Sequence, residues 1–191
     1  MAAQMPETRL RQANSVLRHP ALILGALTLV LHAYVNQRYG VFRDELYFIV
    51  CGRHPDWGYV DQPPLIPLIA ALADHLAPGS LLLLRAVSAL AMAATAAATV
   101  YLARLLDGRL FAQWLAGLCV LLAPVDLAFG ALLTTDAFLP LAWVGCAALV
   151  ILMLRSGDYR LWLFVGIAVG LTLWSKYLIL YYVAALAIVL P

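Results

Sequence analysis

The sequence predicts an all-α integral membrane protein with about six transmembrane helices and two further helices lying at the membrane surface. Hydrophobic side chains make up 65% of the 191 residues and charged side chains only 12%, about half the charged share of a soluble domain. Long apolar runs are bounded by charged or turn residues, as expected of helices that cross a bilayer. One link between the runs is long and contains apolar segments that are too short to cross.

Charge and cysteine content exclude several other classes of protein. Twelve Lys and Arg residues against ten Asp and Glu residues leave a net charge of +2. This balance is too even for a nucleic-acid-binding protein, which must neutralise many phosphates. The three cysteines form neither a CxxC pair nor a dense, even set, and no His and Cys spacing matches a zinc site. We therefore expect no nucleic-acid partner and no zinc site.

Six apolar runs follow one another along the chain. A helix that rises about 1.5 Å per residue needs about 20 apolar residues to cross the hydrocarbon core of a bilayer. The first run follows a basic tail, residues 1–19, and no small-residue cleavage site comes after it, so we expect a retained anchor rather than a signal peptide. The runs cover residues 20–36, 80–106, 110–125, 135–154 and, divided by a turn at Lys176, the two halves of 161–190.

The distribution of Lys and Arg predicts the orientation of these runs. If the tail is cytoplasmic, then the tail and the links at 104–109 and 155–160 together hold seven Arg residues, whereas all other regions hold five basic residues. Cytoplasmic loops carry an excess of Lys and Arg. The sequence therefore predicts a multi-pass protein with a cytoplasmic N-terminus and a long outer loop at 37–79.

The outer loop is where we expect the chemistry, because functional residues concentrate on loops that a rigid scaffold positions. Two segments in it have apolar residues at helical spacing: one opens at Asp44, and the other covers 65–77 after a double proline. Both suit helices that lie at the membrane interface, with aromatic side chains at the depth of the lipid head groups. These aromatic residues are Tyr47, Phe48, Trp57 and Tyr59.

Four carboxylates at the outer boundary each have two interpretations. Asp44 and Glu45 stand where the first interfacial helix begins, so they either cap that helix or form a catalytic pair. Asp61 precedes the double proline, which fixes the start of the second interfacial helix and also aims this carboxylate at a fixed point. Asp136 stands at the start of the fourth run, where a helix cap is the default explanation.

Two cations lie within apolar runs. Arg85 is five residues into the second run and Lys176 divides 161–190, and a charge at the centre of a bilayer costs about 2.5 to 3.5 kcal/mol. Each side chain therefore either reaches out to water or binds an anion. Carboxylates accept protons from attacking hydroxyls, and cations hold departing phosphates. The whole set of outer charges suits group transfer from a lipid-linked phosphate.

Four motifs occur in order along the chain: Arg43-Asp44-Glu45-Leu46-Tyr47, Asp56-Trp57-Gly58-Tyr59-Val60-Asp61-Gln62-Pro63-Pro64-Leu65, Thr135-Asp136-Ala137 and Ser175-Lys176-Tyr177. As an ordered set they resemble the membrane glycosyltransferases of the protein O-mannosyltransferase and aminoarabinose transferase superfamily, especially the bacterial Rgt-like branch. The resemblance extends from the first apolar run to Lys176.

The resemblance implies a GT-C fold, with a transmembrane domain over residues 20–191 and an outer catalytic loop at 37–79. It implies transfer of a sugar from a polyprenyl-phosphate donor to a hydroxyl acceptor on lipid, glycan or protein. The expected location is the outer face of the bacterial cytoplasmic membrane, and the expected partners are the lipid-linked sugar, the acceptor and the bilayer. The motifs establish no cofactor, and a divalent metal ion stays open because some relatives use one.

The resemblance also implies a role for each matching residue. Asp44 takes the place of the first-loop aspartate, the general base, and Glu45 is its acidic catalytic neighbour. Lys176 takes the place of the lysine that meets the donor phosphate. Arg85 has no counterpart among the motifs, and we expect it to help Lys176 stabilise this phosphate. The other expected substrate-binding residues are Asp61, Asp136, Tyr59 and Gln62. Relatives often have His or Lys at position 62.

Family members are longer than this chain, so the resemblance also implies an N-terminal portion that is truncated at its C-terminus. Two other functions stay open. An inactive remnant or membrane subunit would keep the motifs without turnover. A transporter would place polar residues near the middle of the bilayer and often shows repeated halves, and the outer charges and the lack of a visible repeat disfavour it.

Overall fold

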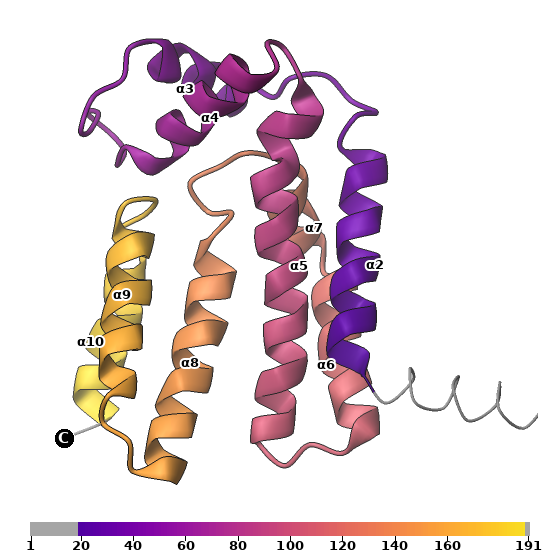
Figure 1. The fold of residues 1–191 in the computed structure, drawn as a ribbon, viewed down its shortest axis with the longest axis vertical. Helices are drawn as coiled ribbons and strands as arrows, with labels where there is room; N and C mark the ends of the chain where they lie inside the picture. Colours follow the sequence, from indigo (N-terminus) through magenta and orange to yellow (C-terminus); the bar gives the residue numbers. More distant parts are fainter. Residues whose placement is uncertain (1–18, 190–191) are drawn as a thin grey trace, which may run out of the picture.

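The computed structural model describes residues 19–189, which form nine helices and no strand. Most of the helices run alongside one another, while two lie across one end of the bundle (Figure 1). The helices are α2 (Pro20–Val35), α3 (Arg43–Arg53), α4 (Leu65–Leu76), α5 (Leu81–Leu105), α6 (Leu110–Leu122), α7 (Pro124–Ala131), α8 (Leu139–Ser156), α9 (Leu161–Leu173) and α10 (Ile179–Val189). The predicted all-α fold is confirmed.

Helix α5 is the centre of the bundle and packs against α2, α6, α7 and α8. The helix begins after Ser80, whose hydroxyl accepts a hydrogen bond from the backbone N–H of Leu83 at 3.3 Å, an N-cap of the usual kind. Small side chains let its neighbours approach closely, as in other membrane bundles. Those that are buried include Ala89, Ala91, Ala93 and Ala96.

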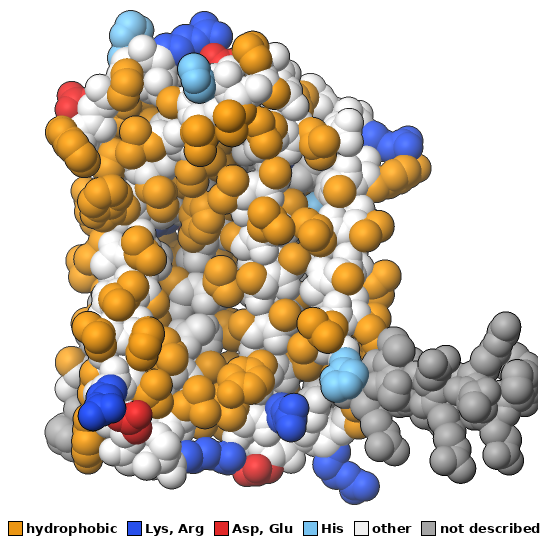
Figure 2. Space-filling view, in the orientation of Figure 1, with side chains coloured by type: hydrophobic (Ala, Val, Ile, Leu, Met, Phe, Trp, Pro, Cys, Tyr) orange, Lys and Arg blue, Asp and Glu red, His pale blue; other side chains and the backbone are white. Residues whose placement is uncertain are grey.

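The helix links separate into two ends of the molecule (Figure 1). The links at 106–109 and 157–160 lie at the end where α2 begins. The segments at 36–42, 132–138 and 174–178 lie at the opposite end with α3 and α4, which we call the α3–α4 end. Charged side chains gather at both ends, and apolar side chains cover the surface between them (Figure 2). This arrangement fits a bundle that crosses a membrane.

Fewer of the helices pass the length test for a membrane span than the six predicted runs. Among residues 19–189, α5 and α8 are long and apolar enough on their own, and α6 with α7 counts as a third span if the bent pair is taken together. The remaining upright helices, α2, α9 and α10, are apolar but have only 16, 13 and 11 residues. All six predicted runs are nevertheless helical.

The third and fourth runs differ in detail from their prediction. Pro124 has no N–H to donate and disfavours helical geometry in the residue before it; accordingly Ala123 is extended, with ψ at 126°. The chain therefore bends by 61° between α6 and α7, and α7 itself was not predicted. An irregular segment at 132–138 follows, so α8 begins at Leu139 rather than at 135. The predicted basic tail lies outside the described residues except for His19.

An apolar cluster holds α3 and α4 across the end of the bundle. Its side chains come from α3, α4, α5 and the segment after α7, so the cluster joins the predicted outer loop to the transmembrane helices. The two predicted interfacial helices are therefore present as one packed pair. The buried members are Phe48, Ile66, Ala70, Ala73, Leu84 and Leu133.

Candidate functional site

The most deeply buried polar contact at the α3–α4 end joins Glu45 of α3 to Arg85 of α5. Arg85 donates from Nε to Glu45 Oε1 at 2.8 Å and from Nη2 to Oε2 at 2.7 Å. Neither side chain has any exposed surface. A bidentate pair of this geometry is among the strongest that a carboxylate and a guanidinium can form.

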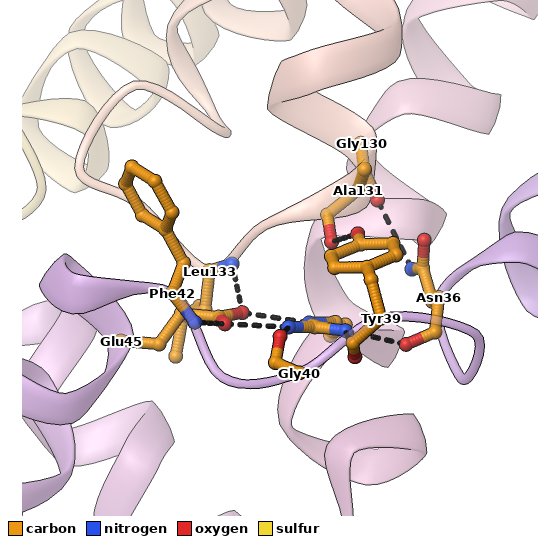
Figure 3. Close-up of polar contacts among 9 residues, drawn as sticks. Asn36, Tyr39, Gly40, Phe42, Glu45, Gly130, Ala131 and Leu133 are labelled. Atoms are coloured by element: carbon orange, nitrogen blue, oxygen red, sulfur yellow. Dashed lines mark hydrogen bonds and ion pairs between the residues drawn. The ribbon is translucent and has the colours of Figure 1, made fainter.

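Backbone groups complete the hydrogen bonds of this pair (Figure 3). Arg85 also donates to three backbone carbonyls, Glu45 accepts from two backbone N–H groups, and the Tyr39 ring lies 4.1 Å from the guanidinium carbon. The carbonyls belong to Asn36, Tyr39 and Gly40, at 2.5, 3.4 and 2.8 Å, and the N–H groups to Phe42 and Leu133, at 2.9 and 3.2 Å. From the sequence we expect a catalytic role for Glu45 and a phosphate-binding role for Arg85; in the structure the two side chains pair with each other and with backbone groups.

Asp44 is the accessible member of the carboxylate pair. Its side chain is 43% exposed and accepts a hydrogen bond from the Nε of Arg43 at 3.1 Å, and the Arg43 side chain is itself 88% exposed. An ion pair this exposed contributes little, so Asp44 stays available to an incoming group. Within residues 19–189, Asp44 forms no hydrogen bond with Asp61, Asp136 or Lys176.

The link between α3 and α4 gathers three of the predicted binding residues against α3. The Tyr47 hydroxyl donates to Asp61 Oδ1 at 2.6 Å, which raises the pKa of the Tyr47 phenol well above its ordinary value. The Tyr59 hydroxyl lies 2.9 Å from the carbonyl oxygen of Cys51, and the buried Gln62 amide faces the sulfur of the same cysteine at 3.9 Å. Asp61 is thereby an oriented, exposed carboxylate, whereas Tyr59 and Gln62 shape the link.

Residues 174–178 connect α9 to α10 and form what we call the α9–α10 junction. The Trp174 carbonyl accepts a hydrogen bond from the backbone N–H of Leu65, the first residue of α4, at 3.0 Å. The Trp174 ring also meets the ring of Trp57 edge to face, with 6.5 Å between centroids. Trp174 therefore holds both ends of the motif that surrounds the double proline.

The next two residues of the junction bind the segment before α8. The Ser175 hydroxyl donates to the Thr135 carbonyl at 2.7 Å. Lys176 Nζ donates to Asp136 Oδ1 at 2.5 Å, and these two side chains are 28% and 27% exposed. Three motifs that are far apart in the sequence therefore meet at three consecutive residues.

An apolar cavity of about 430 Å³ lies directly beside this meeting point, between α8, α9 and the start of α4. Three of its lining residues border the junction: Leu65 bonds to Trp174, Phe138 follows Asp136 by two residues, and the Thr172 carbonyl accepts from the backbone N–H of Lys176 at 2.8 Å. The lining continues along both helices with Ala142, Gly145 and Ala168. The ion pair therefore stands at one end of an apolar space.

The described side chains do not gather into a metal site. Between residues 19 and 189, no group of three or more His, Cys, Asp or Glu side chains lies close enough together to hold a metal ion. Four of the five acidic residues in the motifs instead contact Arg, Lys or Tyr side chains, and the fifth, Asp56, accepts from the backbone N–H of Trp57. The divalent ion that the resemblance leaves open therefore finds no ready set of ligands in this part of the chain.

Comparison with known proteins identifies the family of the chain. The sequence profile of the dolichyl-phosphate-mannose-protein mannosyltransferase family matches residues 61–190. The chain belongs to this family. Membership confirms the predicted superfamily and makes the chain a glycosyltransferase of the GT-C type. The matched region holds the double-proline motif from Asp61 onward and both motifs that meet at the α9–α10 junction. No curated protein and no solved structure matched the chain.

Several contacts that build the site of this mannosyltransferase family member were not predicted from the sequence. Glu45 and Arg85 lie 40 residues apart in the chain, and Trp57 and Trp174 lie more than a hundred residues apart. The sequence did contain a signal for the first contact, because an arginine inside an apolar run is expected to pair with an acidic or backbone partner. The backbone carbonyls that surround Arg85 carry no sequence signal.

Proposed function

We propose that this protein transfers a sugar from a polyprenyl-phosphate donor to a hydroxyl acceptor at the outer face of the membrane. The observation that carries the proposal is the Lys176–Asp136 pair at the end of the apolar cavity of about 430 Å³. A cation beside an apolar cavity suits a ligand with a charged head and an isoprenoid tail, because the cation can bind the head and the apolar walls can bind the tail. Family membership supports the same class of reaction.

The proposed reaction exchanges one bond at the sugar for another. The acceptor oxygen forms a bond to the anomeric carbon while the bond from that carbon to the phosphate oxygen breaks. The electron pair of the broken bond stays on the phosphate, which gains one negative charge. The proton of the acceptor hydroxyl passes to Asp44, and Lys176 stabilises the departing phosphate.

The difference in exposure between the two neighbouring carboxylates decides their proposed roles. A general base must come within hydrogen-bond reach of the proton that it takes, and Asp44 is exposed whereas Glu45 is not. We infer that Glu45 and Arg85 are positioning residues, which hold the start of α3 and hence Asp44 in place. Asp61, which Tyr47 orients, is placed to accept hydrogen bonds from sugar or acceptor hydroxyls.

The variant Asp44→Asn tests this proposal. Removing a general base lowers the rate by about 10² to 10⁴, so we expect transfer of labelled mannose from polyprenyl-phosphate mannose to fall by that factor in membranes that contain the variant. Thermal unfolding should not change, because the side chain makes only an exposed ion pair.

The matched control is Asp74→Asn on α4, another acid at the same end that pairs with an exposed arginine, Arg53, at 3.6 Å. We expect this control to keep full activity. Activity retained in Asp44→Asn, or lost equally in both variants, would contradict the assignment of the base.

A further inference from the structure

The pairing of Lys176 with Asp136 has a consequence for which ligands the site retains. The proposed phosphate-binding cation is already neutralised by a carboxylate at 2.5 Å. We propose that Asp136 is a specificity residue that reduces the preference of the site for a doubly charged phosphate monoester, the spent lipid carrier, relative to a singly charged phosphodiester, the donor. This inference rests on the proposed function, since it takes Lys176 as the phosphate contact.

Local geometry keeps the two charges together. The Ser175 hydroxyl donates to the Thr135 carbonyl at 2.7 Å. This hydrogen bond joins the two residues that immediately precede Lys176 and Asp136. The backbone N–H of Lys176 is held in turn by the Thr172 carbonyl at 2.8 Å. A phosphate that contacts Lys176 therefore lies within a few ångströms of the Asp136 carboxylate, or replaces it on the ammonium group while the carboxylate stays close by.

The charges of donor and product set the direction of the effect. A polyprenyl-phosphate sugar is a phosphodiester with one negative charge. The released carrier is a phosphate monoester, which carries close to two negative charges above its second pKa of about 6. Coulomb energy scales with the product of the charges, so Asp136 opposes the product about twice as strongly as it opposes the donor. The lone cation of Lys176 would have the opposite preference.

This arrangement matters because donor and product share the same lipid tail and compete for the same cavity. A cation without a counter-charge would bind the spent carrier more tightly than the donor, and release of the carrier would then limit turnover. Asp136 weakens the binding of both ligands, and it weakens the binding of the product more. The residue therefore contributes to specificity and to product release rather than to the bond-breaking step.

Binding of two short probes to the detergent-solubilised full chain tests the inference. The probes are a ten-carbon prenyl phosphate monoester and its methyl phosphodiester, measured by calorimetry at about pH 8, where the monoester is doubly charged. In Asp136→Asn, a near-isosteric change, we expect the diester to bind about threefold more tightly and the monoester about tenfold more tightly, because the free-energy change doubles with ligand charge. The control Asp74→Asn should change neither affinity.

The proposed function requires that Lys176→Gln weaken the binding of both probes. If it does, three results would overturn the inference about Asp136 and leave the proposed function intact. One is equal tightening of the two probes in Asp136→Asn. Another is weaker binding of both probes in that variant, which indicates that Asp136 only orients Lys176. The third is tightening of the same size in Asp74→Asn, which indicates a general surface field. If Lys176→Gln leaves both affinities unchanged, the proposed phosphate contact is wrong and the inference falls with it.

Discussion

Glu45 and Arg85 depend on one another because both ions are fully removed from water. Removing an ion from water costs several kcal/mol, and only a partner with matched geometry offsets that cost. Here the pair also binds backbone groups of the 36–42 segment and of Leu133. The pair therefore determines how α3 sits on the bundle, and with it where the exposed neighbour Asp44 points.

We predict that Arg85→Met lowers the free energy of unfolding by about 3 to 5 kcal/mol, because it leaves the Glu45 carboxylate buried without a counter-ion. The double variant Glu45→Leu with Arg85→Met should be more stable than Arg85→Met alone.

Arg53→Met is the control, since its ion pair with Asp74 is exposed and such pairs contribute only about 0 to 1 kcal/mol. Unfolding in denaturant, followed by tryptophan fluorescence, measures all three. Equal losses in Arg85→Met and Arg53→Met would show that the buried pair is not structurally important.

At the level of residues, the sequence singled out several charges but did not predict all of their partners. Asp136 and Lys176 were placed in one binding set and do form an ion pair. Glu45 and Arg85 were placed in different roles, yet they bind each other. The reason is physical: a motif shows which chemistry a side chain offers, whereas its burial depends on the tertiary packing of α3 against α5.

At the scale of elements, the contact between α3 and α4 depends on a glycine. A Cβ atom at Gly52 would lie 2.7 Å from the Pro67 carbonyl oxygen and 2.8 Å from the backbone nitrogen of Ala71. Both neighbours are backbone atoms of α4, so neither can turn aside as a flexible side chain would. Any larger residue at position 52 must therefore push the two helices apart.

We expect Gly52→Ala to destabilise the protein by about 1 to 3 kcal/mol through overpacking, even though alanine favours a helix by about 1 kcal/mol over glycine. Sugar transfer should fall as well, because α3 carries Asp44. Gly58→Ala is the matched control: a Cβ atom there would meet nothing within 4 Å, and open surface sites change stability by less than about 0.5 kcal/mol. Thermal unfolding and the transfer assay on both variants give the comparison, and a Gly52→Ala protein as stable and active as the control would refute the close-approach argument.

Run length and bounding charges located most helices to within a few residues, because apolar length is what a bilayer demands of a span. The expected runs at 20–36 and 80–106 became α2 and α5, at Pro20–Val35 and Leu81–Leu105. Helix α7 was missed because apolar composition continues across Pro124 and hides the bend there. Composition reports hydrophobicity, whereas the bend depends on one missing N–H group.

On the scale of the whole molecule, an ion pair at the end opposite α3 and α4 joins the last turn of α8 to the α5–α6 link. Arg155 Nη2 donates to Asp107 Oδ2 at 2.6 Å, and both side chains are well exposed. Arg155 lowers the pKa of the Asp107 carboxyl below its ordinary value. The pair therefore connects the α5–α6 link to the end of α8.

The lowered pKa of Asp107 gives a pH dependence with a definite sign. A carboxyl that is more acidic in the folded state stabilises the fold above its unfolded pKa of about 4, and this contribution is lost as the pH falls through the folded value. We predict that protection against hydrogen exchange, relative to the intrinsic rate at each pH, falls in acid at the α5–α6 link and the end of α8 in the wild type. In Asp107→Asn this protection should already be lower at neutral pH and should change less with pH. Asparagine is chosen because it tolerates the positive φ of 61° at this position.

Asp158→Asn is the control for that experiment, because the Asp158 carboxylate accepts a hydrogen bond from the backbone N–H of Arg160 in its own link and, within residues 19–189, makes no ion pair with another helix. Its exchange profile should keep the acid dependence of the wild type. Acid dependence that persists in Asp107→Asn would show that other carboxylates set the mobility of these links.

The short length of α9 affects the bilayer around the protein. Thirteen residues rise about 20 Å, whereas the hydrocarbon core is about 30 Å thick. The membrane must therefore either become thinner beside α9 or extend past the α9–α10 junction. If the membrane becomes thinner, Lys176 comes to the depth of the lipid phosphates, where the proposed carrier can reach it by moving sideways within its own leaflet. A long-chain carrier could thus deliver its sugar without lifting its tail out of the membrane.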